Sequence, residues 1–142
     1  MAGIERSATG MWHGDLRSGK GQIDSTSGVL QNTPYTFATR FENAKGTNPE
    51  ELIAAAHAAC YSMAFANYLS QQGHVPDEIT TRATITLDNG VINKMHLVTK
   101  GKVPGLDEET FERLADEAEK KCPVSNLLRN GLAITLEASL AE

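Results

Sequence analysis

The longest apolar stretch of the chain, Leu52 to Leu69, places hydrophobic or small residues on nearly every helical face. Asn48 and Pro49 precede it and form a typical helix start, because an Asn side chain caps free N–H groups and proline suits the first helical position. Gly73 supplies a stop at the other end. We therefore predict a helix from Pro49 to about Gln72 that is buried on all sides.

The segment before this helix has a different pattern, in which short runs with strand propensity are separated by glycines. Such runs between turn residues predict β-strands. The predicted strands are Thr9 to His13, Gly21 to Ser25 and Tyr35 to Glu42.

After the long helix, polar and apolar residues alternate strictly. Residues 79–88 alternate in this way, which predicts a half-exposed strand. Asp88-Asn89-Gly90 is a strong hairpin signal, so Val91 to Val103 is expected to run back as the paired strand.

A second helix is predicted after Asp107, which is a good N-cap. Cys122 lies on the apolar face of this helix, near its end. Pro123 then opens a short helix through Leu128, because proline disfavours helical backbone at the residue before it. Ala133 to Ser139 is expected to close the fold as a strand. The apolar stripe of the second helix consists of Phe111, Leu114, Ala115 and Ala118.

This order of strands, helix, hairpin, helix and strand indicates an α+β fold with antiparallel sheet, in one domain over residues 1–142. One sheet cannot cover a helix that is apolar on every side. We therefore expect a homodimer in which the first long helix is central.

Composition narrows the function classes. The formal net charge of −5 and the pI near 5.4 argue against nucleic acid or an anionic membrane as the main partner. No apolar run is expected to span a bilayer, and the N-terminus lacks a secretory pattern, so cytoplasmic residence is predicted. In a reducing cytosol, two cysteines are free or redox-active more often than they form a structural disulfide.

Cys60 ends a run of alanines within the predicted long helix. It could be a small buried hydrophobe, since free cysteine is often buried. A reactive thiolate would need a nearby cation or helix N-terminus to lower its pKa. The start of this helix is three turns away, so a cation would have to come from another part of the fold.

Arg40, in a predicted strand, is the preferred source of that cation, and Arg17, in a glycine-rich turn, is the rival. Either could instead be a solvated surface arginine. Glu50 and Glu51 both lie in the first turn of the long helix, where carboxylates are favoured. Because Glu51 suits a capping-box role, Glu50 is free to orient an arginine through a bidentate contact.

Cys122 precedes the short helix at Pro123, so its sulfur could face free N–H groups at a helix start, or simply pack in the core. Its position relative to Cys60 cannot be deduced from spacing. His57 lies one turn before Cys60, but two ligands are too few for a structural zinc site, and a satisfied buried histidine is the preferred interpretation. We expect no bound metal or organic cofactor.

Several of these segments together resemble the OsmC/Ohr family over nearly the whole chain, with the better match to its OsmC branch. The most specific are Thr47-Asn48-Pro49-Glu50-Glu51 ahead of Cys60, and Cys122-Pro123-Val124-Ser125; Trp12-His13-Gly14-Asp15, Ser27-Gly28-Val29-Leu30 and Phe41-Glu42 also match.

The resemblance implies a thiol-dependent peroxidase that reduces organic hydroperoxides, and hydrogen peroxide more weakly, in stress defence. It also implies an intertwined homodimer with antiparallel sheets wrapped around two central long helices. By the same resemblance Cys60 is the peroxidatic cysteine, Cys122 its resolving partner, Glu50 the family's acid and Arg40 the arginine of the OsmC branch. A dithiol, such as a lipoylated protein, is the implied reductant.

Two other functions remain open at this stage. One is a non-enzymatic redox sensor or ligand-binding dimer that uses the same cysteines as a switch. The other is a hydrolase with Cys60 and His57 as nucleophile and base, which is disfavoured because one-turn spacing leaves little room for an oxyanion hole.

Overall fold

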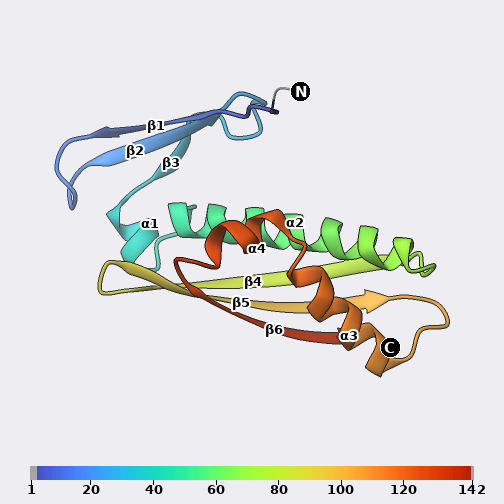
Figure 1. The fold of residues 1–142 in the computed structure, drawn as a ribbon. Helices are drawn as coiled ribbons and strands as arrows, with labels where there is room; N and C mark the ends of the chain where they lie inside the picture. Colours follow the sequence, from blue (N-terminus) through green and yellow to red (C-terminus); the bar gives the residue numbers. More distant parts are fainter. Residues whose placement is uncertain (1–2, 142) are drawn as a thin grey trace. The chain divides into compact units, whose positions relative to one another are not determined.

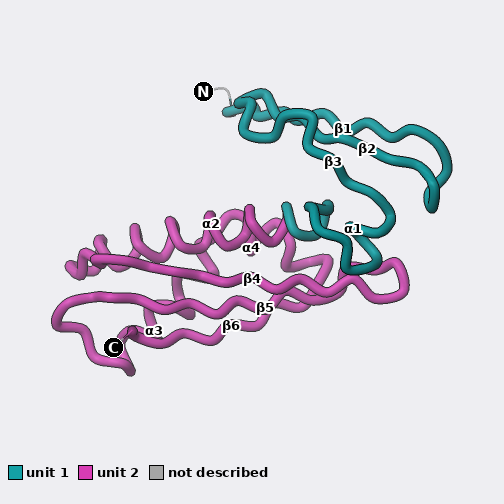
Figure 2. Tube along the Cα trace, turned by 180° about the vertical axis from the view of Figure 1, so that it is seen from behind, with its two compact units in different colours: residues 1–52 teal, residues 53–142 magenta. Residues whose placement is uncertain are grey.

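The computed structural model describes residues 3–141 and divides into two compact units, the first up to Leu52 and the second from Ile53 on. Figure 2 shows the two units in different colours. The expectation of a single domain over residues 1–142 stays a prediction.

The first unit is built on a three-stranded antiparallel sheet of β1 (Ala8–His13), β2 (Lys20–Ser25) and β3 (Thr33–Tyr35), in that order. Trp12 and Tyr35 pack against each other with ring centroids 5.4 Å apart. They approach over Gly21, where an added Cβ would lie 2.6 Å from the Tyr35 ring, so only glycine fits there. The first two predicted strands are confirmed.

The third predicted strand is wrong beyond Tyr35, because Phe37–Phe41 forms a short helix, α1. Thr36 caps this helix: its hydroxyl accepts from the Thr39 N–H while the Thr39 hydroxyl accepts from the Thr36 N–H. This reciprocal cap uses threonine where glutamate or glutamine is usual, which is why the strand propensity of the segment was misleading. Arg40 therefore lies in the last turn of a helix and not in a strand.

The long helix α2 (Pro49–Gln71) confirms the predicted start and end. The Asn48 side chain accepts a hydrogen bond from the Glu51 N–H at 2.7 Å, and the Glu51 carboxylate accepts from the Thr47 hydroxyl. Gly73 follows with φ +89°, the left-handed conformation that ends many helices.

The second unit has a three-stranded sheet of β4 (Glu78–Asp88), β5 (Val91–Lys102) and β6 (Ala133–Leu140). The hairpin is confirmed, since Asp88 pairs with Val91 and both Asn89 and Gly90 have positive φ. The expected purely antiparallel sheet is not: β6 pairs parallel with β5. A parallel neighbour requires a crossover, and the helices between β5 and β6 supply it.

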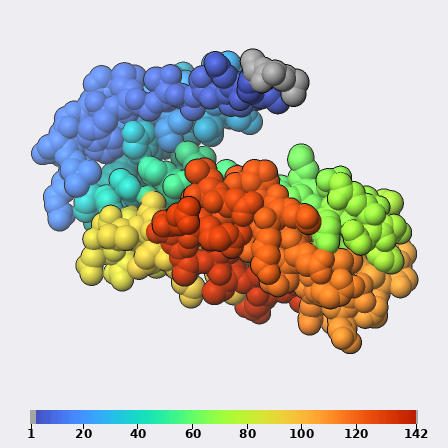
Figure 3. Space-filling view, viewed as in Figure 1, coloured from blue at the N-terminus to red at the C-terminus, as the bar shows by residue number. Residues whose placement is uncertain are grey.

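That crossover consists of α3 (Glu108–Glu119), capped by the Asp107 side chain, and α4 (Pro123–Leu128). Figure 1 shows α2 along one face of the β4–β5–β6 sheet, and in Figure 3 the orange to red surface of the crossover covers part of the unit beside the green end of α2. The core between these elements contains the whole predicted stripe of α3. The buried residues of this core include Tyr61, Phe65 and Leu69 of α2, Met95 and Leu97 of β5, and Phe111, Leu114, Ala115 and Ala118 of α3.

Close packing in this core depends on Gly101 of β5. A Cβ at Gly101 would lie 2.6 Å from the ring of Phe111, so the aromatic ring occupies the space that any other residue would fill. The ring of Phe111 in turn lies 5.0 Å from that of Phe65, which links α3 to α2.

Helix α2 is also the one helix among residues 3–141 that is long and apolar enough, by length and composition, to cross a membrane. The expectation that no apolar run reaches that length was therefore wrong, because residues 52–71 contain no charged side chain. One side of α2 packs in the core of the second unit, as the core helix of a folded domain does.

The buried hydroxyl of Tyr61 donates to the Ala115 carbonyl at 2.7 Å and joins α2 to α3. We expect Tyr61→Phe to lower the free energy of unfolding by about 1–2 kcal/mol, because a buried acceptor loses its partner. Tyr68→Phe is the matched control, since its acceptor Glu117 is open to water and should cost less than about 1 kcal/mol. Urea unfolding measures both, and equal losses would contradict this role of the Tyr61 bond.

Candidate functional site

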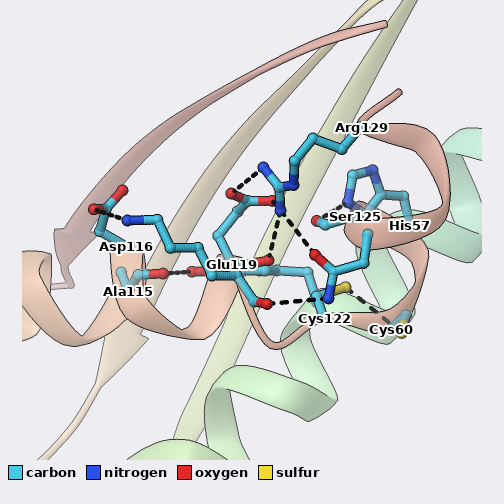
Figure 4. Close-up of polar contacts among 11 residues, drawn as sticks. His57, Cys60, Ala115, Asp116, Glu119, Cys122, Ser125 and Arg129 are labelled. Atoms are coloured by element: carbon cyan, nitrogen blue, oxygen red, sulfur yellow. Dashed lines mark hydrogen bonds and ion pairs between the residues drawn. The ribbon is translucent and has the colours of Figure 1, made fainter. Parts of the chain in front are cut away.

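The two cysteines, which are far apart in the sequence, meet in the second unit. Both are free thiols, and their sulfur atoms lie 3.6 Å apart. Figure 4 shows the contact between Cys60 on α2 and Cys122 at the start of α4. A disulfide needs sulfurs about 2 Å apart, so a small side-chain movement would close this gap.

Pro123 creates the position of Cys122. Helix α3 ends at Glu119, and Cys122 has extended backbone (φ −75°, ψ 119°) as the N-cap of α4, with proline at the first helical position. The chain therefore leaves one helix and enters another at the cysteine, while the Cys122 side chain stays fully buried with the α3 stripe. Packing and helix break together direct the sulfur toward α2.

The two thiols have different surroundings. Cys60 is partly exposed whereas Cys122 has no exposed surface. Burial has the largest effect and raises the pKa of the Cys60 thiol; the Val124 N–H acts to lower this pKa, and the neighbouring Cys122 acts to raise it. Within this unit Cys60 is thus the more accessible sulfur but is not activated.

Burial also acts to raise the pKa of Cys122, but its neighbours outweigh this effect and lower the pKa to about 7. The largest favourable contribution comes from the His57 imidazole, followed by the N–H and hydroxyl of Ser125. The surroundings of Cys122 therefore favour its thiolate, whereas those of Cys60 do not.

His57 is completely buried, and its Nε2 lies 2.7 Å from the Ser125 hydroxyl. Its other ring nitrogen, Nδ1, is buried and has no hydrogen-bond partner among residues 3–141. The predicted interpretation of a satisfied histidine is therefore correct for one nitrogen only.

An ion pair lies behind this histidine. Arg129 makes a bidentate contact with the Glu119 carboxylate, at 3.0 and 2.7 Å, and Glu119 is almost fully buried. Burial opposes ionisation of Glu119, but Arg129 and the Ser125 hydroxyl together hold the pKa of its carboxyl below the usual value. Glu119 is therefore a buried carboxylate with a fixed orientation.

In the first unit, Arg40 and Glu50 form the bidentate pair expected from the sequence. Arg40 Nε and Nη2 donate to the two Glu50 oxygens at 3.0 and 2.9 Å. Glu50 is 7% exposed, so its charge is largely withdrawn from water and fixes the guanidinium. The contact raises the pKa of Arg40.

Arg40 also borders a cavity of about 410 Å³ within the first unit. The rival Arg17 lies over the Phe37 ring, 4.7 Å from its centroid, in a cation–π contact. The residues that line the cavity are mainly aromatic and apolar: Trp12, Gly14, Leu16, Tyr35, Thr36, Phe37, Arg40 and Phe41.

Of the predicted residues, the structure brings Cys60 next to Cys122 and Arg40 next to Glu50. Whether the second pair serves the first stays a prediction. Sequence reasoning missed Glu119 and Arg129. The available signal was weak: Glu119 is an acidic residue directly after Ala118, the last stripe residue of α3.

The chain is similar to members of one protein family over most of its length. The family model described as OsmC-like protein matches residues 42–137. Peroxiredoxin OsmC of Escherichia coli is 45% identical over 141 residues, which cover 96% of this chain and 97% of that protein. The organic hydroperoxide resistance protein OhrB of Bacillus subtilis is 32% identical over 121 residues, or 82% of this chain and 88% of that protein.

Solved structures agree on the fold. The crystal structure of OhrB from Bacillus subtilis superposes with a TM-score of 0.69 at 28% identity and covers 94% of this chain and 98% of its own. An organic hydroperoxide resistance protein from Elizabethkingia anophelis gives a TM-score of 0.77 at 24% identity and covers 99% of this chain and 100% of its own. The latter likeness concerns the fold alone.

Proposed function

The chain belongs to the OsmC-like family, and on this premise we propose that Cys60 and Cys122 carry out its chemistry as peroxidatic and resolving cysteine. The protein is a thiol-dependent peroxidase that reduces organic hydroperoxides and requires a reductant. We further propose that hydrogen peroxide is a weaker substrate and that the protein acts in the cytoplasm, in stress defence, as one functional domain.

The observation that carries the residue assignment is the sulfur pair itself. Two free thiols 3.6 Å apart, one partly exposed and one buried, fit a reaction in which peroxide meets the outer sulfur and the inner sulfur follows. A peroxide can reach Cys60 but not Cys122, so exposure favours Cys60 as the first to react.

In the first step the Cys60 thiolate attacks the distal peroxide oxygen. The O–O bond breaks, the alkoxide takes a proton and leaves as an alcohol, and Cys60 becomes a sulfenic acid. In the second step the Cys122 thiolate attacks the Cys60 sulfur, hydroxide leaves as water, and a disulfide forms. An external dithiol then reduces the disulfide, and we propose a lipoylated protein as its source.

The first step requires a Cys60 thiolate, although its own unit raises the pKa of this thiol. We propose that Arg40 supplies the missing positive charge and also orients the peroxide. Its fixed bidentate contact with Glu50 supports this role, because a guanidinium held in one orientation stabilises an anion better than a mobile one.

The cavity beside Arg40 suits the organic part of the substrate. Its aromatic and apolar lining favours an alkyl or aryl group over a bare, hydrated peroxide. This preference matches the organic hydroperoxides on which the family acts.

We also propose that the protein is a homodimer with α2 at its centre. A single chain buries only 22% of the most apolar 18-residue window of this helix. Met63 is 76% exposed, and Ala55, Ala56 and Ala59 are exposed on the same helix. A second copy would cover this uncharged face.

We expect Cys60→Ser to abolish peroxide turnover, since the serine hydroxyl is a much weaker nucleophile than a thiolate. Cys122→Ser should still reduce one equivalent of peroxide and then stall, or be overoxidised at Cys60. Alcohol formation under excess dithiol measures both. Undiminished turnover in Cys60→Ser would contradict the assignment, and a single turnover by the wild-type protein would instead indicate a sensor.

We expect Arg40→Lys to lower kcat/KM for an organic hydroperoxide by roughly tenfold or more, because lysine cannot keep the bidentate contact with Glu50. The midpoint of the pH–rate profile for Cys60 oxidation should move to higher pH, since the thiolate loses its stabilising charge. Arg17→Lys is the matched control and should leave both values nearly unchanged. The reverse order of effects would assign the role to Arg17.

For the dimer, we expect size-exclusion chromatography with light scattering to give twice the chain mass at micromolar concentration. Met63→Glu places a charge on the exposed face of α2 and should shift the protein toward monomer. Met11→Glu, on a partly exposed methionine of β1, is the control. A monomeric wild-type protein would rule out this arrangement.

A further inference from the structure

The spacing of the two free sulfurs suits a bridging atom as well as a later direct bond. The Cys60 and Cys122 sulfurs lie 3.6 Å apart, whereas a disulfide brings two sulfurs to about 2 Å. Two bonds of about 2.3 Å, the length from zinc to sulfur, that meet at about 100° separate their ends by about 3.5 Å. One atom bonded to both sulfurs therefore fits between them with almost no movement.

Both sulfurs are held in place by the fold. Cys60 lies in the middle of α2, and Cys122 is the N-cap of α4 with its side chain fully buried. Figure 4 shows the two side chains meeting from these helices. A ligand that joins them costs the protein little conformational freedom, and the second bond forms within the complex that the first bond creates.

The donors select the kind of ligand. Thiolates bind soft centres, and Cys122 supplies a thiolate near neutral pH because its surroundings lower its pKa to about 7. A divalent metal ion is disfavoured, since zinc needs at least three protein ligands and residues 3–141 contain no group of three His, Cys, Asp or Glu that could hold a metal ion. A trivalent arsenic atom that carries one organic group needs only two further bonds, which the two cysteines can supply.

We propose that the reduced Cys60–Cys122 pair is a chelating site for trivalent organoarsenicals, in which both sulfurs bond to one arsenic atom. The partly exposed Cys60 sulfur meets the ligand first, and the buried Cys122 sulfur closes the chelate. Chelation requires only the reduced thiols, so it does not depend on the peroxidase roles proposed for them.

The reaction is a condensation without electron transfer. The probe phenylarsine oxide reacts in water as its hydrate, in which arsenic carries the phenyl group and two hydroxyls. Each cysteine forms an As–S bond as an As–O bond breaks, and each thiol proton leaves with the displaced hydroxide, so two waters are released. Arsenic stays trivalent and both sulfurs stay at the thiol oxidation level. An external dithiol reverses the step by exchanging its own two sulfurs for those of the protein.

The mass of the adduct tests the chelate in the unaltered protein. The chain contains two cysteines, so every As–S bond must use this pair. Native mass spectrometry of reduced protein with phenylarsine oxide should show one arsenic per chain and the loss of two waters from the hydrate. An adduct that has lost a single water, two arsenic atoms per chain, or no adduct at all would overturn the proposal.

Competition with excess glutathione tests the same point with variants. The wild-type protein should keep the arsenical, whereas apparent affinity should fall roughly 100-fold or more in Cys60→Ser and Cys122→Ser, because a single As–S bond has no second site to retain it.

The matched control combines Cys60→Ser with Ser70→Cys. It keeps two thiols and the same composition, but moves one thiol by about 15 Å along α2, which is ten residues at about 1.5 Å each. Ser70 is exposed on that helix, so the exchange disturbs no core contact. This protein should bind as weakly as the single variants, and retention equal to that of the wild type would rule out a chelate.

Peroxide reduction gives a separate readout. In a single turnover, protein loaded with phenylarsine oxide should form no alcohol from an organic hydroperoxide, and removal of the arsenic with dithiothreitol should restore the reaction. Loaded protein that still reduces peroxide would refute the proposed function and leave the chelate in place. Reduced wild-type protein that turns over normally but binds no arsenic would rule out the chelate alone.

Discussion

The site depends on the packing of the crossover helices against α2. The buried stripe of α3 and the break at Pro123 bring Cys122 within 3.6 Å of Cys60, and Tyr61 joins the same two helices by a buried hydrogen bond. A shift of α3 by one side-chain layer would separate the sulfurs. The packing of the core therefore also sets the distance between the two thiols.

The surroundings of the two cysteines differ in a way that suits the separate roles we propose for them. The buried Cys122 is surrounded by groups that favour its thiolate, His57 and Ser125, and these two are hydrogen-bonded to each other. The partly exposed Cys60 has no comparable support within its unit and depends on a charge supplied from elsewhere. Arg40, oriented by Glu50, is the group that we propose for this purpose.

Most of the fold could be predicted because its signals are local. The Asn48-Pro49 start and Gly73 stop of α2, the Asn89-Gly90 turn and the α3 stripe each follow from a few neighbouring residues. The threonine cap of α1 and the parallel pairing of β6 were missed, because the first imitates a strand and the second depends on tertiary contacts.

The site was less accessible to sequence reasoning. Spacing along the chain carries no distance, so the pairing of Cys60 with Cys122 came from family resemblance. The arrangement of Glu119, Arg129 and Ser125 around His57 joins residues of three helices. No local pattern encodes such a cluster, and only the folded chain brings its members together.

The parallel pairing of β6 has a consequence for the speed of turnover. Because both ends of the crossover are tied to the sheet, Cys122 is held near Cys60 in the reduced protein, with the sulfurs 3.6 Å apart. In the cycle that we propose, its effective molarity toward an oxidised Cys60 therefore stays high. Under this proposal the disulfide forms without local unfolding, so a second peroxide has little time to drive Cys60 to the irreversible sulfinic state.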